Sequence, residues 1–444
     1  MATMAINPTI TTRTRYRWVV LALMFTLYTI AFADRANIGI ALPHIKDEFG
    51  LTNAQAGLVA GMFSAVYAIC QFPSSLAVKR LGVNRAVPIF MILSSGAAAL
   101  GGIATSFFML KASRILLGIV EAPLAISMTT TINSWFPPRE KGTAAGIFMA
   151  STKFGPVIVP PLGALIIASF GWRYVFFVFA APGVILAIMW FLMVKDHPRQ
   201  SRFVSESEAL HIEGVGSDER AATVRSAGAF PRLDRLIRAR RTEPLETTRE
   251  VLQSWTVWGS ALCYCLVQGV VGVILFLLPL YLTEVKKLSI MNVGFVASAP
   301  FAGAVMGNML GGWISDRVFG GRRKPMMILT LFSTVITMWL LRGAPDHAPT
   351  LALILFVIGV LLTLGYSAYS VYAAPLTTTG TFPVAFSIIN TMGQVGTAAA
   401  PLIVGASIDR FGWNAVFAGL SVCSLTGLVV MLTILEPLPH EPAR

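Results

Sequence analysis

The sequence predicts an all-α membrane protein of twelve transmembrane helices, arranged as two pseudo-symmetric six-helix bundles. Of the 444 residues, 55% are hydrophobic and only 12% are charged. The mean hydropathy of +0.71 is too high for a soluble globular protein. Apolar runs of about 20 residues, the length that crosses a bilayer, recur along the chain between short polar breaks.

The apolar runs place six spans before a long polar segment and six after it. The spans predicted in the first half cover residues 18–40, 55–77, 86–105, 109–132, 143–167 and 172–194. Those predicted in the second half cover residues 252–282, 292–314, 326–341, 349–372, 384–407 and 413–435.

Four parts of the chain follow from this pattern. We expect an N-terminal six-helix bundle over residues 1–194, a cytoplasmic linker over 195–250, a C-terminal six-helix bundle over 251–436 and a cytoplasmic tail over 437–444. The linker is rich in Arg, Glu, Ser and Pro, a composition that favours polar, loosely structured chain. Its basic residues predict a short amphipathic helix over residues 232–241.

Repeated motifs predict that the two bundles are homologous. Phe-Gly-Trp at residues 170–172 recurs at residues 411–413, at the same place between two spans. Lys-Arg-Leu-Gly at residues 79–82 parallels Asp-Arg-Val-Phe-Gly at residues 316–320. Internal repeats of this kind are common in secondary transporters.

The formal charge of +13 is concentrated in every second connection between spans. This distribution follows the positive-inside rule and predicts a bacterial inner-membrane protein with both termini in the cytoplasm. Attraction to anionic lipid accounts for the charge, so we expect no nucleic-acid partner. The basic positions include Arg13, Arg15, Arg17, Lys79, Arg80, Arg85, Arg139, Lys141, Arg317, Arg322, Arg323, Lys324 and the stretch 195–249.

Enzymatic, metal and nucleotide sites are not expected. The five histidines lie in predicted loops, tails or the linker, and the four cysteines all lie inside apolar runs, so neither a metal nor a catalytic group is indicated. No phosphate-binding loop of an ATP-driven pump is present. We therefore expect no cofactor, no enzyme activity and a monomeric membrane protein.

The segment Gly-Gly-Trp-Ile-Ser-Asp-Arg at residues 311–317, with the basic run after Gly320, resembles the cytoplasmic signature of the major facilitator superfamily. An acid beside a base at a helix end can pair with a neighbouring helix when the cytoplasmic side is shut, so Asp316 and Arg317 are predicted gating residues. Arg80 is the matching base in the first half. There Lys79 replaces the acid, so any such latch is weaker or differently built.

A narrower resemblance comes from residues 33–37, 114–122 and 134–142, which are similar to the anion:cation symporter branch of that superfamily. The branch includes galactonate, hexuronate, phthalate and tartrate permeases and the vesicular glutamate and sialic acid carriers. The resemblance implies proton-coupled import of a small carboxylate. It further implies that Asp34 and Glu121 carry protons and that Arg35 binds the substrate carboxylate. Tyr67 and Asn390 match substrate contacts of the family.

Ionisable residues deep within spans are costly, about 2.5–3.5 kcal/mol each, and so indicate function. Asp34 is predicted ~9 Å and Arg114 ~8 Å below the outer ends of their spans, and therefore at one depth. Glu121 follows Arg114 by two helical turns, near the level of Lys153. We predict the ion pairs Asp34–Arg114 and Glu121–Lys153, which leave Arg35 for a ligand and assign Arg114 to proton coupling.

Simpler uses of these charges remain open. Asp34 and Arg114 could serve only to hold two helices together, and Lys153 could serve only to pair with Glu121. Sugar-acid members of the branch have Gln where this chain has Thr152, and here a cation follows it. This change favours a second acidic group or an aromatic acid over a polyhydroxy acid.

The second half offers neutral substrate contacts. Gln268 lies in the seventh span, Tyr372 ends the tenth and Asn390 lies in the eleventh. We therefore expect the first half to handle protons and the second half to recognise substrate shape. Interhelix packing is an alternative use of each tyrosine. Proton-driven efflux of an organic anion or drug, and a non-transporting membrane sensor, are the alternative functions.

Overall fold

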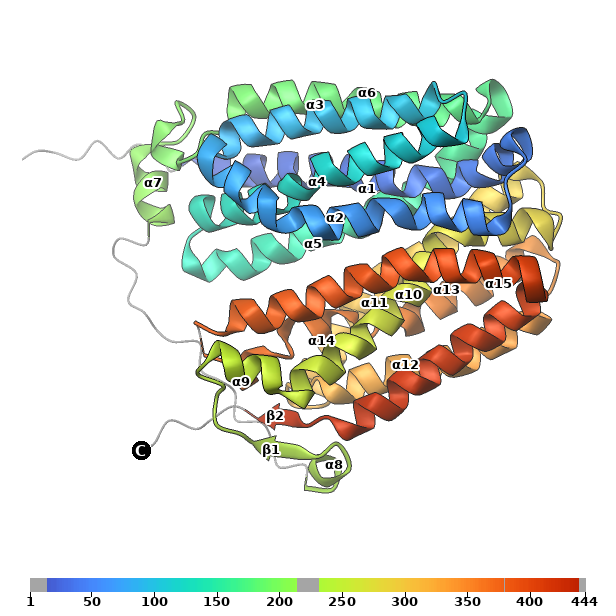
Figure 1. Cartoon of the computed structure of the whole chain (residues 1–444). Coiled ribbons are helices and arrows are strands. Elements are labelled where there is room, and N and C mark those ends of the chain that lie inside the picture. Colours follow the sequence, from blue (N-terminus) through green and yellow to red (C-terminus); the bar gives the residue numbers. More distant parts are fainter. Residues whose placement is uncertain (1–13, 214–230, 379, 439–444) are drawn as a thin grey trace, which may run out of the picture.

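The computed structural model describes residues 14–213, 231–378 and 380–438. Arg13 of the predicted basic N-terminus, residues 214–230 of the predicted linker and residues 439–444 of the predicted tail lie outside the described residues. The two halves of the chain form two helical bundles that lie side by side, with the segments before and after the linker in separate bundles (Figure 1).

Six long helices make the N-terminal bundle, and each is apolar and long enough to span a membrane. The first, second, fourth and fifth are longer than the predicted spans because polar residues at their ends continue the helical conformation beyond the apolar run. The helices are α1 (Tyr16–Phe49), α2 (Asn53–Leu81), α3 (Val83–Gly102), α4 (Phe107–Trp135), α5 (Pro138–Phe170) and α6 (Trp172–Met193).

The C-terminal bundle contains α10 (Trp255–Glu284), α11 (Ile290–Arg317), α12 (Lys324–Leu340), α13 (Ala348–Thr363), α14 (Tyr366–Val371) and α15 (Phe382–Thr433). Eleven candidate spans are found among the described residues of the whole chain. The last of these, α15, holds two spans joined at the non-helical residue Gly412. The prediction of twelve spans is therefore confirmed.

The joint between the last two spans repeats a joint in the first half. Gly412 has φ 73° and ψ 175°, and Gly171 between α5 and α6 has φ 89° and ψ 166°. Both angles lie in a region that favours glycine because a side chain would clash with the backbone. The shared conformation gives a physical reason for the repeated Phe-Gly-Trp motif.

The predicted tenth span is not one continuous helix. It divides into α13, which ends at Thr363, and α14, which begins at Tyr366. The N–H group of Gly365 donates a hydrogen bond to the hydroxyl of Thr330 in α12, at 2.7 Å. This bond satisfies a backbone donor that the interrupted helix leaves unpaired.

The linker contains η1 (Pro198–Gln200), α7 (Glu206–Ile212), α8 (Pro231–Leu236), β1 (Ala239–Arg241) and α9 (Thr248–Gln253). The helix predicted over residues 232–241 is therefore wrong in its second half. Arg238 has φ 55°, which ends helical structure, and β1 pairs in parallel with β2 (Glu436–Leu438) at the C-terminus. Residues of the predicted tail thus form a strand with the linker.

Linker segments attach to both bundles. The buried carboxylate of Glu208 in α7 accepts hydrogen bonds from the N–H of Tyr16, at 3.0 Å, and from the guanidinium of Arg17, at 2.9 Å. The carboxylate of Glu436 in β2 accepts hydrogen bonds from the N–H groups of Arg323 and Lys324, at 2.7 and 2.9 Å. The linker and tail therefore cap one end of the molecule, called here the linker end (Figure 1).

The opposite end, called here the loop end, carries the polar contacts between bundles. Asp409 of α15 accepts hydrogen bonds from the N–H groups of Asn53 and Ala54, the first residues of α2, at 3.1 and 2.9 Å. Lys46 of α1 forms an ion pair with Glu284 of α10. Among the described residues, this is the ion pair that joins the two bundles. The ribbons lie closest here and diverge toward the linker end (Figure 1).

Two glycines bring α2 against α15 near the loop end. A Cβ added to Gly57 would stand 2.1 Å from the carbonyl oxygen of Pro401, and one added to Gly61 would stand 2.1 Å from that of Ala398. Neither space admits a methyl group. Backbone-to-backbone approach through small residues is the usual way in which membrane helices pack tightly.

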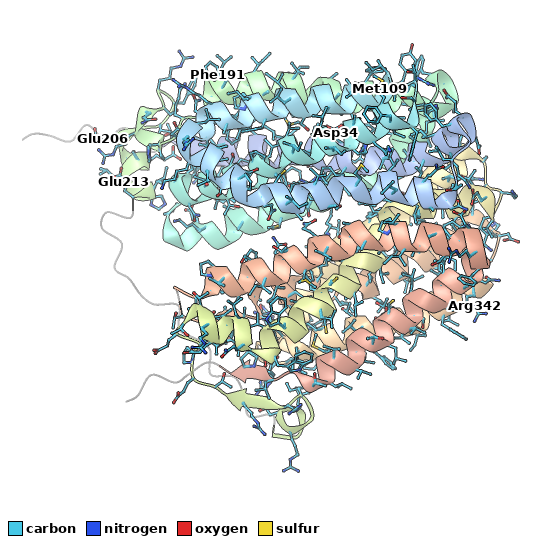
Figure 2. All side chains as sticks on the ribbon, in the orientation of Figure 1. Asp34, Met109, Phe191, Glu206, Glu213 and Arg342 are labelled. Carbon is cyan, nitrogen blue, oxygen red and sulfur yellow. The ribbon has the colours of Figure 1, made fainter. Side chains whose placement is uncertain are left out.

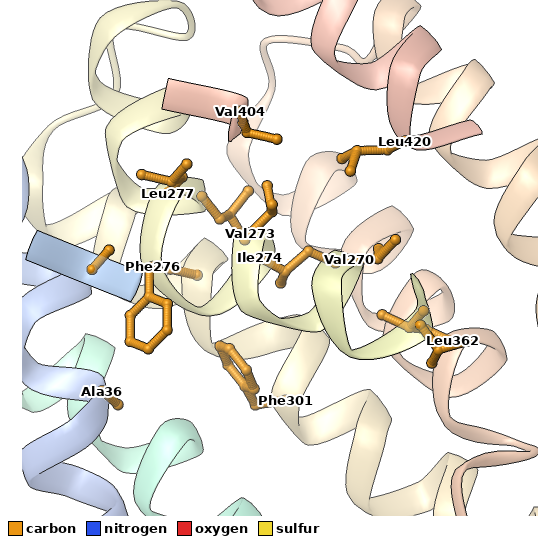
Figure 3. Close-up of a cluster of buried hydrophobic side chains, with 14 of the residues drawn as sticks. Ala36, Val270, Val273, Ile274, Phe276, Leu277, Phe301, Leu362, Val404 and Leu420 are labelled. Carbon is orange, nitrogen blue, oxygen red and sulfur yellow. The ribbon is translucent and has the colours of Figure 1, made fainter. Parts of the chain in front are cut away.

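The apolar core extends across both bundles. In Figure 3, side chains of α10 such as Val270 and Val273 pack beneath Val404 of α15, while Phe276 and Phe301 lie toward Ala36 of α1. Because α10 is buried along most of its length, it connects the core of the C-terminal bundle to the interface with α1.

Candidate functional site

Five ionisable side chains occupy the middle of the N-terminal bundle. Asp34 and Arg35 come from α1, Arg114 and Glu121 from α4, and Lys153 from α5. Asp34 and Glu121 are fully buried, whereas Lys153 is half-buried. Figure 2 shows Asp34 about midway along its bundle, far from either end. Four of the five charges that the sequence predicted to be deep are therefore buried within the fold, and Lys153 is half-buried.

Glu121 pairs with Arg35. The Nε of Arg35 donates to Oε2 of Glu121 at 2.6 Å, and Ser94 donates to the other carboxylate oxygen at 3.4 Å. The predicted pair between Glu121 and Lys153 is therefore wrong. Equal depth did not determine the partner, because the rotation of α1 about its axis turns Arg35 toward α4.

Arg114 lies against Asp34 but does not bind its carboxylate. Its guanidinium donates to the main-chain carbonyl of Asp34 at 3.4 Å and to the side-chain oxygen of Asn37 at 3.5 Å. Both carboxylate oxygens of Asp34 are buried without a hydrogen-bond partner among the described residues. The two residues are neighbours as predicted, but the predicted ion pair is wrong. A buried acid without a partner calls for a functional explanation.

Aromatic rings surround the guanidinium of Arg35. Its central carbon lies 4.3 Å from the ring centre of Phe32, 4.9 Å from that of Phe63 and 4.5 Å from that of Tyr67. Such rings stabilise a cation through their electron-rich faces. The Nη2 atom of Arg35 has no hydrogen-bond partner among the described residues, so it remains able to bind a ligand.

A cavity of about 130 Å³ lies between the two bundles. Four of the predicted substrate contacts line it: Arg35, Thr152, Lys153 and Gln268. Its other lining residues are Phe32, Phe63, Ser64, Pro156, Val271, Ile274, Leu275, Phe276, Pro300, Phe301, Ala304, Gly359, Leu362, Thr363, Tyr366, Gln394 and Thr397. Both bundles therefore contribute to one small site, next to the Arg35–Glu121 pair.

Three predicted substrate contacts do not line this cavity. Tyr67 lies behind Arg35, with its ring against the guanidinium. Tyr372 is buried, and its hydroxyl donates to the main-chain carbonyl of Leu435 near the linker end. Asn390 is half-buried in α15. In this conformation the structure thus brings together four of the seven predicted contacts and separates the rest.

The sequence analysis missed the phenylalanines of the cavity. Phe32 and Phe63 come from the N-terminal bundle, and Phe276 and Phe301 from the C-terminal bundle. No sequence signal separates them from phenylalanines that face lipid, because both environments favour the same apolar ring. Their role becomes visible only when the two bundles are placed together.

The predicted gating residues lie at the linker end. Asp316 pairs with Arg323 of its own bundle at 2.8 Å. Arg317 lies over the ring of Trp313 in the same helix, at 5.9 Å. Arg80 is exposed at the end of α2. In this conformation Asp316 therefore has a partner within the C-terminal bundle, and gating by the three residues stays a prediction.

No group of three or more His, Cys, Asp or Glu side chains that could hold a metal ion is found in the described parts of the chain. The site instead combines cations, buried acids and a cavity between bundles. This arrangement can bind an anion and exchange protons, as polar groups in the middle of a membrane commonly do.

Comparison with known proteins gives consistent results. The family model of the Major Facilitator Superfamily matches residues 24–295 and 260–444. The D-galactonate transporter of Escherichia coli O6:H1 is 27% identical over 93% of this chain and 94% of that protein. A probable galactarate/D-glucarate transporter of Bacillus subtilis is 26% identical, over 96% and 93%. A probable sulfoacetate transporter of Cupriavidus necator is 30% identical, over 69% and 66%.

Solved structures agree on the fold. A bacterial homologue of the human lysosomal transporter Spinster, in an inward-facing and occupied conformation, superimposes with a TM-score of 0.72 over 94% of this chain and 95% of that chain. The sequence identity is 17%, so this likeness concerns the fold alone. With family-model matches in both halves, twelve spans and transporters among its relatives, the chain is a multi-pass membrane transport protein, not an enzyme, and it belongs to the major facilitator superfamily.

Proposed function

We propose that this protein imports a small organic anion together with protons across a bacterial inner membrane, by alternating access. The observation that carries the proposal is the buried ion pair between Arg35 and Glu121 at the edge of the cavity. The relatives named above are a transporter of D-galactonate and probable transporters of galactarate and D-glucarate or of sulfoacetate, all of which are small organic acids.

The ion pair supplies a mechanism for coupling. An acidic group of the substrate and the carboxylate of Glu121 compete for the same guanidinium. When a proton binds to Glu121, its charge is removed and Arg35 is released to grip the substrate with its planar fork of N–H groups. When the proton leaves, the Arg35–Glu121 ion pair forms again and Arg35 binds the anion less tightly. Linkage of this kind is reciprocal, so substrate binding also favours proton binding.

Asp34 is the second proposed proton carrier. Its carboxylate has no hydrogen-bond partner among the described residues, although Arg114 lies against its main chain. Movement of the Arg114 guanidinium onto the carboxylate would favour the ionised form of Asp34, and its withdrawal would favour the protonated form. Arg114 thus acts in coupling by responding to the protonation of Asp34. Thr152, Lys153 and Gln268 are the proposed substrate contacts beside Arg35 in this conformation.

Orientation and conformational change complete the proposal. The positive-inside rule assigns the basic linker end to the cytoplasm, and with it both termini. The bundles are then held together on the outer side, by Asp409 and by the Lys46–Glu284 pair. Alternation requires that these contacts break while new ones form at the linker end, where Asp316, Arg317 and Arg80 are the proposed gating residues.

Uptake into proteoliposomes tests this function. Labelled galactonate, glucarate and sulfoacetate would be offered with and without an acidic exterior. We expect the acidic exterior to drive accumulation of at least one acid in the wild type. Glu121→Gln should abolish this accumulation but retain exchange of internal for external substrate, because a permanently neutral residue 121 leaves Arg35 able to bind the anion.

Glu48→Gln is a matched control, because Glu48 pairs with Arg173 within one bundle at the loop end. It should behave like the wild type. Accumulation that is independent of the pH gradient would overturn proton coupling. Accumulation driven only by an acidic interior, in right-side-out vesicles with the cytoplasmic face inside, would indicate proton–anion antiport and therefore efflux.

A further inference from the structure

The hydroxyl groups of the cavity are largely committed to the protein itself. The hydroxyl of Thr152 donates to the carbonyl of Met149 at 2.7 Å, and that of Thr363 donates to the carbonyl of Gly359 at 2.8 Å. The hydroxyl of Thr397 donates to the carbonyl of Gly393 in its own helix, at 3.2 Å. A hydroxyl has a single proton to donate. These three lining residues therefore present oxygen atoms, not donors, to a ligand.

Hydrocarbon makes up most of the remaining wall. Four phenylalanines contribute ring surface, and aliphatic residues of α10, α11 and α13 complete it. Figure 3 shows Phe276, Phe301, Ile274 and Leu362 in the apolar cluster of the C-terminal bundle. The other neutral polar side chains in the wall are Ser64, Gln268, Gln394 and the phenol of Tyr366. These are too few to satisfy the many hydroxyls of a buried sugar acid, since each hydroxyl both donates and accepts.

Two cations from the same bundle line this largely apolar wall. Arg35 retains an unpartnered Nη2 atom, as described above. Lys153 has no acidic partner among the described residues, and its ammonium group lies 4.2 Å from the ring centre of Tyr366 in the opposite bundle. Aromatic contact holds a cation without neutralising it. An anionic group of a ligand would both hold the ammonium group of Lys153 and neutralise its charge.

The balance of charge sets the charge of the ligand. The deep side chains comprise three cations, Arg35, Arg114 and Lys153, and two acids, Asp34 and Glu121. Protonation of Glu121 alone, with Asp34 still ionised, leaves two positive charges in excess. A ligand with two negative charges neutralises this excess, and unbalanced charge is strongly disfavoured inside a membrane.

We infer that the cavity binds a compact organic dianion with a hydrocarbon body, with one acidic group on Arg35 and the other on Lys153. The inference rests on the proposed function for the role of Arg35. The volume of about 130 Å³ is small compared with typical pockets for drug-sized ligands and suits a short molecule. Lys153 and the apolar wall are the specificity determinants.

Binding to the purified full-length protein tests the inference with matched pairs of ligands. Adipate and galactarate share a carbon chain and two carboxylates and differ in their hydroxyls. Phthalate and benzoate share a ring and differ in the second carboxylate. By calorimetry at low ionic strength and mildly acidic pH, we expect adipate to bind at least tenfold more tightly than galactarate, and phthalate at least tenfold more tightly than benzoate.

Substitution of Lys153 assigns the second acidic group. Lys153→Gln should lower the affinity for phthalate at least tenfold and leave that for benzoate within about twofold, whereas Lys153→Arg should retain most of the preference. Lys111→Gln is the control, because Lys111 in α4 lies over the ring of Phe107 and does not line the cavity. It should leave both affinities unchanged.

The outcomes separate this inference from the proposed function. Galactarate binding as tightly as adipate, equal binding of phthalate and benzoate, or no binding by any dianion would overturn the inference. The wild-type comparison holds even if a variant at position 153 does not fold. Proton-driven uptake of a sugar acid with no dianion preference would retain the function and refute the inference. Dianion binding without gradient-driven flux would retain the inference and refute the function.

Discussion

Arg35 is a residue with several competing partners. It is held by Glu121 at 2.6 Å and by the faces of aromatic rings, yet one nitrogen remains unpartnered beside the cavity. Inside a membrane, loss of one member of a buried ion pair leaves the other charge uncompensated. The pair therefore matters for stability as well as for substrate binding.

A double-mutant cycle would measure this effect. Arg35→Gln should destabilise the folded protein by about 3–5 kcal/mol, the typical cost of an unpaired buried charge. Adding Glu121→Gln should recover much of this loss, since no carboxylate then remains to be neutralised. Thermal unfolding in detergent is the measurement. Equal loss in the single and double variants would show that Glu121 is already neutral once Arg35 is removed, so that no uncompensated carboxylate causes the loss.

Glu436 provides a pH-dependent contact at the linker end. Burial removes its carboxyl from water and raises its pKa from the ordinary value of 4.5 to about 7, against the opposing effect of the N–H groups of Arg323 and Lys324. Because the folded pKa lies above the unfolded one, the stabilisation is complete below pH 4.5 and is lost as the pH rises through about 7.

Hydrogen exchange can detect this loss. We expect the protection factors of the β1 and β2 amides, corrected for intrinsic exchange, to fall as the pH rises from about 4.5 to about 7. Glu436→Gln should flatten the dependence, because the amide does not titrate. Protection that stays constant across this range in the wild type would exclude a titrating contact at the strand pair.

The sequence predicted which residues would be deep, but not which would pair. Depth follows from position along a helix, which the apolar runs define well. Pairing also depends on the rotation of each helix and on side-chain direction, which depend on packing. Arg35 and Asp34 are adjacent in sequence but point in different directions. Glu121 therefore pairs with Arg35, and Lys153 contacts the ring of Tyr366.

At the scale of elements, α2 begins with a cap drawn from both bundles. Thr52 accepts a hydrogen bond from the N–H of Gln55 at 3.2 Å, within its own bundle. Asp409 of the other bundle accepts from the N–H groups of Asn53 and Ala54. A carboxylate at a helix N-terminus accepts hydrogen bonds from free N–H groups and interacts favourably with the positive end of the helix dipole. The start of α2 therefore keeps the Asp409 part of its cap only while the loop end is shut, whereas the Thr52 part is local.

Removal of this carboxylate should open the loop end. Asp409→Ala is expected to destabilise the closed form relative to the open form by about 1 kcal/mol, the usual contribution of a helix cap. Spin labels at Asp47 and Lys287, which are exposed on the two bundles, would then report a larger population at long distance. Asp346→Ala is the control, since Asp346 pairs with Lys286 of its own bundle. Identical distance distributions in both variants would argue against a latch at Asp409.

Elements were predictable where hydropathy defines them and not elsewhere. Each membrane span corresponds to an apolar run, so every span was found, although α1 extends to Phe49, well beyond its predicted end at residue 40. The break at Gly365 was missed because α13 and α14 lie in one unbroken apolar run. The pairing of β1 with β2 was missed because it joins segments nearly two hundred residues apart, and three residues form too short a strand for a periodic signal.

At the scale of the whole molecule, the site and the contacts that close it lie in different places. The cavity is midway between the ends, while the ion pair between bundles and the Asp409 cap lie at the loop end. Alternating access requires the bundles to move relative to each other around a fixed site. Locking one end should therefore stop transport without removing the site.

A covalent bridge tests this requirement. Lys46→Cys combined with Glu284→Cys, joined by a short thiol cross-linker, should abolish uptake while leaving ligand affinity within about threefold, because neither residue lines the cavity. Lys286→Cys with Asp346→Cys gives the same bridge within one bundle and should leave uptake intact. Undiminished flux through the protein bridged between bundles would refute a moving loop end.

The glycine contacts between α2 and α15 have a consequence for the rate of this motion. Gly57 and Gly61 meet carbonyl oxygens, so no side chain at these two positions must change rotamer when the helices part. The polar part of the barrier to separation then arises from breaking the Asp409 contacts and the Lys46–Glu284 pair at the loop end. Dissolved ions weaken such contacts within a Debye length of about 10 Å at 0.1 M ionic strength. Turnover limited by this step should therefore quicken as ionic strength rises.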